Sequence, residues 1–172
     1  MAKQIEDVQL DSIDRLITQW RNENIESDLL PMAILGRLAK LGKYIDNDIL
    51  HCHQQHDLRQ GEFDVLATLR RSGKPYSLTP SELYQSMLLT SGAMTSRLDR
   101  LETKGLIRRE HSQADRRSIQ VTLTTRGKKT IDSVLPAHIA AQHRLLDGVS
   151  QRDRQVLAQL LKRWLTQLES VN

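Results

Sequence analysis

The tripeptide Asp115-Arg116-Arg117 carries the clearest chemistry in this sequence. It ends a polar stretch that separates two segments with the pattern of β-strands. An arginine at the tip of such a hairpin can enter a narrow minor groove of DNA, where the negative potential is strongest. Asp115 can orient the guanidinium through paired hydrogen bonds. In an isolated turn these residues would only be solvated charges, so their position after a candidate recognition helix is what favours a DNA-binding role.

That helix is predicted over residues 91–104, with an apolar face formed by Met94, Leu98 and Leu101. Its outward side chains are mostly small or hydrogen-bonding, as side chains that fit the major groove of DNA often are. Residues 90–117 contain seven basic and four acidic residues, a net charge of +3, whereas the whole chain carries +4. Because the positive charge is concentrated there, a polyanionic partner is indicated. The residues that we predict to contact DNA are Ser91, Thr95, Ser96, Arg100, Asp115, Arg116 and Arg117.

Several helices precede this segment and must position it. The apolar spacing predicts one helix capped by Asp11 or Ser12, one over about residues 30–56 and one from about residue 61 to residue 72. The strongest start signal is Thr79-Pro80-Ser81-Glu82, with threonine at the N-cap, proline at the first helical position and glutamate closing a capping box. The short helix that follows, together with the recognition helix, predicts a helix-turn-helix.

The periodicity changes after the predicted recognition helix. Gly105 provides the left-handed residue that ends the helix. Residues 118–123 then alternate between polar and apolar as a half-buried strand should, and residues 107–111 can pair with them as the other arm of a β-hairpin. Thr124 caps a long helix, and a break at residues 148–150 separates it from a last one. The order α-α-α-α-α-β-β-α-α predicts a mainly α (α+β) fold, a winged helix-turn-helix with N- and C-terminal dimerisation helices.

The last helix has a broad apolar face. Packing within the chain would use such a face, but a lone winged domain needs no flanking helices, so a homodimer interface is favoured. We therefore expect N-terminal helices for dimerisation and a ligand pocket over residues 1–57, a DNA-binding domain over 58–124 and C-terminal dimerisation helices over 125–172. The residues of the apolar face are Val156, Leu157, Leu160, Leu161, Trp164, Leu165 and Leu168.

The composition excludes several classes of protein. A single cysteine, Cys52, rules out a disulfide within the chain and suits a reducing cytosol. No apolar stretch approaches the roughly 18 residues of a membrane span, and the N-terminus lacks the pattern of a signal peptide. No Gly-rich phosphate loop, H-E-x-x-H or nucleophile elbow is present. We expect a cytoplasmic, nucleoid-associated protein that is not an enzyme and has no catalytic residues, metal, cofactor or membrane partner.

From Leu58 to about Gly127 the sequence resembles the MarR family of bacterial regulators. The resemblance implies a homodimer whose N- and C-terminal helices interlock, with two winged domains one DNA turn apart on a palindromic operator. It also implies that Arg117 is the minor-groove arginine and Asp115 its orienting partner. The motifs that carry it are residues 62–66, 78–83, 97–102, 104–107, 115–117, 121–124 and Gly127.

A narrower branch, the urate-responsive MarR regulators, is similar at Trp20-Arg21-Asn22, residues 63–66, residues 68–73 and residues 91–95. By that resemblance the ligand site uses Trp20, Asp64, Arg97 and Arg109. A planar purine anion such as urate or xanthine can stack on an aromatic ring such as that of Trp20 and accept paired hydrogen bonds from a guanidinium such as that of Arg97. The implied function is a transcriptional regulator, in the first instance a repressor, that urate or a related purine or aromatic anion releases from DNA.

Other interpretations remain open from the residues alone. Trp20 can be a core aromatic residue and Asp64–Arg97 a structural ion pair. The cluster of His51, Cys52, His53 and His56 is a second candidate sensor. Within it, Cys52 and His56 are four residues apart and are potential zinc ligands on one face of a helix. A DNA-binding protein without sequence preference would also explain the charge, but not the serine- and threonine-rich helix. The operator sequence, the regulated genes, the true effector (a purine, a phenolic acid or zinc) and the choice between repression and activation are not specified by the sequence.

Overall fold

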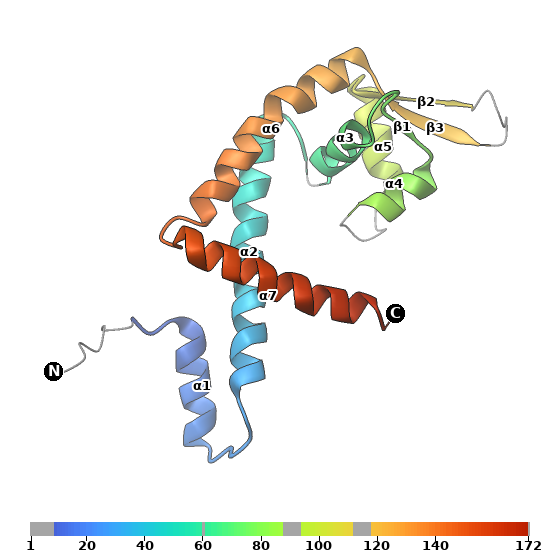
Figure 1. The fold of residues 1–172 in the computed structure, drawn as a ribbon. Coiled ribbons are helices and arrows are strands. Elements are labelled where there is room, and N and C mark those ends of the chain that lie inside the picture. Colours follow the sequence, from blue (N-terminus) through green and yellow to red (C-terminus); the bar gives the residue numbers. More distant parts are fainter. Residues whose placement is uncertain (1–8, 60, 88–93, 112–117, 172) are drawn as a thin grey trace. The chain divides into compact units, whose positions relative to one another are not determined.

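The computed structural model describes residues 9–59, 61–87, 94–111 and 118–171 (Figure 1). The chain divides into two compact units, residues 1–47 and residues 48–172. Helix α2, Leu30–Gln54, begins in the first unit and ends in the second. Among the described residues, no helix is both long enough and apolar enough to cross a membrane.

The first unit pairs α1, Ser12–Asn22, with the first part of α2. The N-cap of α1 is Asp11, one of the two caps expected from the sequence, and its carboxylate accepts hydrogen bonds from the backbone of Ile13 and Asp14. Arg37 of α2 donates to Asp11 over 2.8 Å and to Asp14 over 2.5 Å. The helix cap and the link between the helices therefore use the same carboxylates.

The second unit contains most of the secondary structure. The predicted capping box at Thr79 is confirmed, with the Thr79 hydroxyl accepting from Glu82 N–H and the Glu82 carboxylate accepting from Thr79 N–H. Gly105 ends the recognition helix with a φ of +66°, also as predicted. The elements are α3 Glu62–Arg71, β1 Ser77–Leu78, α4 Pro80–Ser86, α5 Met94–Thr103, β2 Ile107–His111, β3 Ile119–Leu123, α6 Thr125–Leu145 and α7 Gln151–Glu169.

The sheet has three strands in the order β1-β3-β2, with both pairings antiparallel. The hairpin of β2 and β3 is the predicted one, with Ile107 opposite Leu123. The sequence-based element order was wrong in omitting β1. A strand of only two residues is too short to show an alternating pattern, and it exists because Ser77 pairs with Thr122 through backbone register and a 2.8 Å hydroxyl contact.

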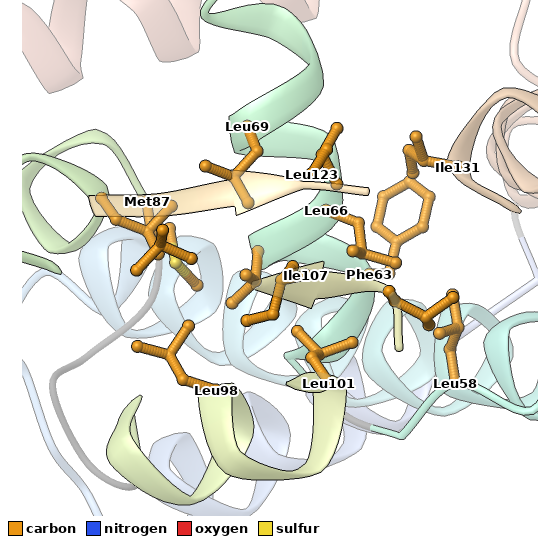
Figure 2. Packing of buried hydrophobic residues seen from close by; sticks show 14 of the residues in the cluster. Leu58, Phe63, Leu66, Leu69, Met87, Leu98, Leu101, Ile107, Leu123 and Ile131 are labelled. Atoms are coloured by element: carbon orange, nitrogen blue, oxygen red, sulfur yellow. The ribbon is translucent and has the colours of Figure 1, made fainter. Parts of the chain in front are cut away.

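One hydrophobic core joins α3, α4, α5, α6 and the sheet, and Figure 2 shows its packing. Leu66, Leu69 and Leu101 are fully buried in it, so α3 and α5 share one apolar interior. By contrast, α7 contributes no buried residue. The side chains of Figure 2 that carry labels are Leu58, Phe63, Leu66, Leu69, Met87, Leu98, Leu101, Ile107, Leu123 and Ile131.

Candidate nucleic-acid interface and ligand site

The apolar face of α5 fixes which of its side chains face outward. Leu98 and Leu101 are buried in the core. Thr95 and Ser96, two of the predicted DNA contacts, are exposed. A third, Ser91, lies outside the described residues. The described part of α5 therefore has the amphipathic arrangement that a recognition helix needs.

Arg100, also predicted to contact DNA, is held by hydrogen bonds within the protein. Its Nε donates to Oε1 of Glu62 over 2.8 Å, and its Nη1 donates to the Ser96 hydroxyl over 2.6 Å. The side chain is 30% exposed. The orientation of the guanidinium is thus set from inside the molecule, and Ser96 is linked to α3 through Arg100.

The hairpin of β2 and β3 is the wing of the fold and extends away from α3, α4 and α5 (Figure 1). Its strands are paired from Ile107 and Leu123 as far as His111 and Ile119. The predicted minor-groove residues Asp115, Arg116 and Arg117 lie outside the described residues.

Arg109, a predicted ligand residue on β2, is bound to α5. Its Nε donates to Glu102 over 2.9 Å, and Nη2 contacts Glu102 at 2.5 Å and Asp99 at 2.8 Å. The backbone N–H of Arg109 also donates to Glu102. This network ties the wing to the recognition helix, and it raises the pKa of Arg109 mainly through the side-chain hydrogen bond to Glu102.

Asp64 and Arg97 are the other two predicted ligand residues of the second unit, and they lie close enough for their charges to interact. Burial raises the pKa of Asp64, and the nearby charges of His138 and Arg97 only partly oppose this effect. Nη1 of Arg97 is buried and has no hydrogen-bond partner among the residues that the structure describes. A buried guanidinium nitrogen without a partner is costly, so this group is suited to an added acceptor.

Gly61 gives the Arg97 side chain its space. A Cβ atom at this position would lie 2.7 Å from Cζ of Arg97 and closer still to Nε. The backbone there has a φ of +77°, which favours glycine. The start of α3 is therefore shaped around the Arg97 guanidinium.

Trp20, the fourth predicted ligand residue, belongs to the first unit. It lies on α1 with 45% of its surface exposed, so it is not a core residue within the described chain.

A stack of aromatic rings lies at the end of α2. His53 is buried and stacks on Phe63 at 4.2 Å, and its Nε2 is 3.1 Å from Nδ1 of His138 on α6. Cys52 is also buried, whereas α2 ends at Gln54, before His56. In the part of the chain that the structure describes, no group of three or more His, Cys, Asp and Glu residues is arranged to hold a metal ion.

The buried His53 makes stability depend on pH. Burial, with smaller contributions from His138 and His56, lowers its pKa to about 4 from the usual 6.5. Between these values the unfolded chain binds more protons, so the free energy of unfolding falls as the pH drops below 6.5. We expect His53→Gln to reduce the slope between pH 6.5 and pH 5 by up to about 1.4 kcal/mol per pH unit. Denaturant unfolding at several pH values across this range measures the slope. A slope that His53→Gln leaves unchanged would contradict the lowered pKa of His53.

The sequence alone did not indicate that Glu62 contacts Arg100 and Lys104, or that His138 contacts His53. Glu62 has the pattern of an exposed acid in the first turn of a helix, where it complements the helix dipole. Its partners Arg100 and Lys104 are about 40 residues away in sequence. The four-residue spacing of Arg100 and Lys104 is the signal that the sequence offers, and it does not identify Glu62 as their partner.

The comparisons with known proteins agree with this geometry. A family model described as the MarR family matches residues 56–118. The HTH-type transcriptional regulator PecS of Dickeya dadantii (strain 3937) is 36% identical over 151 residues, which cover 88% of this chain and 91% of that protein. The HTH-type transcriptional repressor MdtR of Bacillus subtilis (strain 168) is 32% identical, over 74% of this chain and 80% of its own length. A mutant of MarR from E. coli, solved in complex with operator DNA, has a TM-score of 0.69 and 26% identity, covering 81% of this chain and 99% of that one.

The helix-turn-helix, the following wing and these relatives together define a winged helix-turn-helix transcriptional regulator. The chain belongs to the MarR family.

Proposed function

We propose that this protein is a ligand-responsive repressor that binds a palindromic DNA operator as a homodimer. The observation that carries the proposal is α5, which buries Leu98 and Leu101 and exposes Thr95 and Ser96 directly before a β-hairpin wing. The relative MdtR is named a repressor, and the E. coli MarR mutant was solved with operator DNA, which supports the same role here. The proposed division of labour is dimerisation and ligand binding in residues 1–57, DNA binding in 58–124 and dimerisation in 125–172.

The apolar surfaces left uncovered in the single chain support the homodimer. The seven apolar residues of the α7 face, Val156 to Leu168, are each at least 38% exposed. The first part of α2 adds exposed Leu30, Leu35 and Leu41. Exposed apolar faces of this kind mark protein interfaces. A twofold dimer covers both copies of such a face at once and presents two recognition helices to a palindrome.

Arg117 is the residue that we propose to enter the minor groove. Arg117→Ala is expected to weaken binding to all duplexes and to reduce the slope of log affinity against log salt by about 1, because one phosphate-region cation is removed. Fluorescence anisotropy at several salt concentrations measures this slope. Arg126→Ala, an exposed arginine at the start of α6, is the matched control. An unchanged slope for Arg117→Ala would reject the wing assignment.

The proposed effector is urate or a related purine or aromatic anion. The unpartnered Nη1 of Arg97 can donate to such an anion, and the Asp64 carboxylate can accept from its ring N–H groups. Trp20 offers an exposed ring for stacking. Because Arg97 lies on α5 and Arg109 ties α5 to β2, an anion bound there would alter the angle of the recognition helix and wing.

Thermal unfolding with urate, xanthine, salicylate or zinc tests the effector. A ligand present at one hundred times its dissociation constant stabilises the folded protein by about 2.7 kcal/mol. We expect urate or xanthine to raise the melting temperature of the wild type, and Trp20→Phe and Asp64→Ala to lose most of that rise. Trp164→Phe and Asp132→Ala are matched controls that should keep it.

A rise with zinc alone would transfer the sensor role to the cluster at His51–His56. A rise that Trp20→Phe and Asp64→Ala both retain would overturn the proposed site while leaving a purine ligand in place.

A further inference from the structure

Glu62 is a fully buried carboxylate on which two cations converge, Arg100 of α5 and Lys104, the residue that follows this helix. Arg100 Nε contacts its Oε1 at 2.8 Å, and Lys104 Nζ contacts its Oε2 at 3.0 Å. The backbone N–H of Arg59 also donates to Oε2 over 2.9 Å. Each carboxylate oxygen therefore accepts at least one hydrogen bond, and Glu62 links the start of α3 to the C-terminal end of α5.

The charge on Glu62 is retained despite its burial. Burial alone raises the pKa of the carboxyl group, but the hydrogen bonds from Arg59, Arg100 and Lys104 outweigh this effect and lower it overall. Glu62 is thus an anion at neutral pH. Lys104 is held further by the backbone carbonyl of Asp57 and, at 3.6 Å, by the Asp57 carboxylate.

The two contacts on α5 constrain its orientation. Lys104 follows the last residue of α5, but its N–H still donates to the carbonyl of Arg100 over 2.9 Å, so the two side chains leave the same side of the chain one turn apart. The hydrogen bonds to Glu62 are directional, whereas the apolar contacts of Leu98 and Leu101 are not. Two directional bonds one turn apart fix both the rotation of α5 about its axis and its position along α3.

The same carboxylate also orients residues on the outward face. Arg100, while bonded to Glu62, donates through Nη1 to the hydroxyl of Ser96. A continuous path of hydrogen bonds therefore leads from the buried start of α3 to the exposed face of the recognition helix.

We propose that Glu62 is a positioning residue for DNA recognition, which holds α5 at the angle that lets its outward residues discriminate between base sequences. The proposal rests on the proposed function, because it needs α5 to be the recognition helix. A buried ion pair contributes little net stability compared with an apolar replacement, whereas fixing geometry is its best-attested use. Removing one partner of such a pair leaves the other charges unpaired and is itself destabilising, so folding and sequence discrimination must be measured separately.

The test compares Glu62→Gln with the wild type on two duplexes, one selected from a random pool by the wild-type protein and one of scrambled sequence. Glutamine keeps the size of the side chain but cannot neutralise Arg100 and Lys104. We expect affinity for the selected duplex to fall and affinity for the scrambled duplex to stay or rise slightly, since one negative charge is lost. The ratio of the two affinities should fall by at least about tenfold, as when one well-recognised base pair is lost.

Asp132→Asn is the matched control. Asp132 accepts from Arg70 at 2.7 Å and Lys128 at 2.6 Å, so the variant removes the same charge from a two-cation site on α6. It should leave the ratio unchanged. Lys104→Met is a second variant in which Glu62 keeps Arg100, and it should lower the ratio by a smaller factor.

The possible results distinguish a failure of the positioning role of Glu62 from a failure of the proposed function. A Glu62→Gln protein that melts near the wild-type temperature but keeps the full ratio would overturn the positioning role alone. If Glu62→Gln does not fold, an unchanged ratio for Lys104→Met would overturn it instead. A wild type that selects no duplex from the pool would overturn the proposed function and this inference together.

Discussion

Replacing Leu161 and Trp164 by glutamate is expected to convert the protein from a dimer to a monomer. Both side chains lie on the exposed apolar face of α7, at 39% and 38% exposure. In a dimer interface the two copies would bury four new carboxylates in apolar surroundings, each at a cost of several kcal/mol. Sedimentation velocity should show the mass fall from twice 19.7 kDa to 19.7 kDa.

The same double variant is expected to lose operator affinity by a factor of about 100 or more, because two linked recognition helices raise each other's effective concentration. Gln159→Glu is the control, since the helical period places Gln159 on the opposite side of α7 from the apolar face. It should leave both the mass and the affinity unchanged. A wild type with the mass of one chain, or a double variant that stays dimeric, would refute the assignment of α7.

Gly127→Ala is expected to destabilise the fold by about 3 kcal/mol, near the upper end for overpacked sites. Gly127 is buried at the first turn of α6, where its N–H donates to the Thr124 hydroxyl. A Cβ atom there would lie 2.8 Å from the carbonyl carbon of Leu106 and closer still to its oxygen. Backbone cannot move aside as a flexible side chain can, and the Leu106 carbonyl already accepts from Thr124.

Denaturant unfolding at one fixed protein concentration measures this effect, since dimerisation makes stability depend on concentration. Gly42→Ala is the contrasting control, because Gly42 lies within α2 and a Cβ there meets nothing within 4 Å. That variant should gain about 0.5–1 kcal/mol from the higher helix propensity of alanine. Equal effects of the two substitutions would show that the contact of Gly127 with the Leu106 backbone is looser than described.

The candidate site could be predicted only in part from the sequence. Asp64, Arg97 and Arg109 were proposed as ligand residues, and the structure adds a distinct environment for each. Asp64 has a raised pKa because it is partly buried, Arg97 has a buried nitrogen without a described partner, and Arg109 is bound by Glu102 and Asp99. These environments depend on neighbours from other elements, which no local pattern specifies.

The sequence by itself determined the local structure of this protein. The caps at Asp11 and Thr79 and the left-handed Gly105 follow from interactions within a few residues of chain, and the β2–β3 hairpin pairs two segments that are neighbours in sequence. Tertiary structure alone decided β1, which exists through its pairing with β3, and the contact of His53 with His138, 85 residues apart. It also placed Glu62 inside the molecule beneath Arg100 and Lys104, because only packing of α3 against α5 brings a buried anion to two cations that offset the free energy of its desolvation.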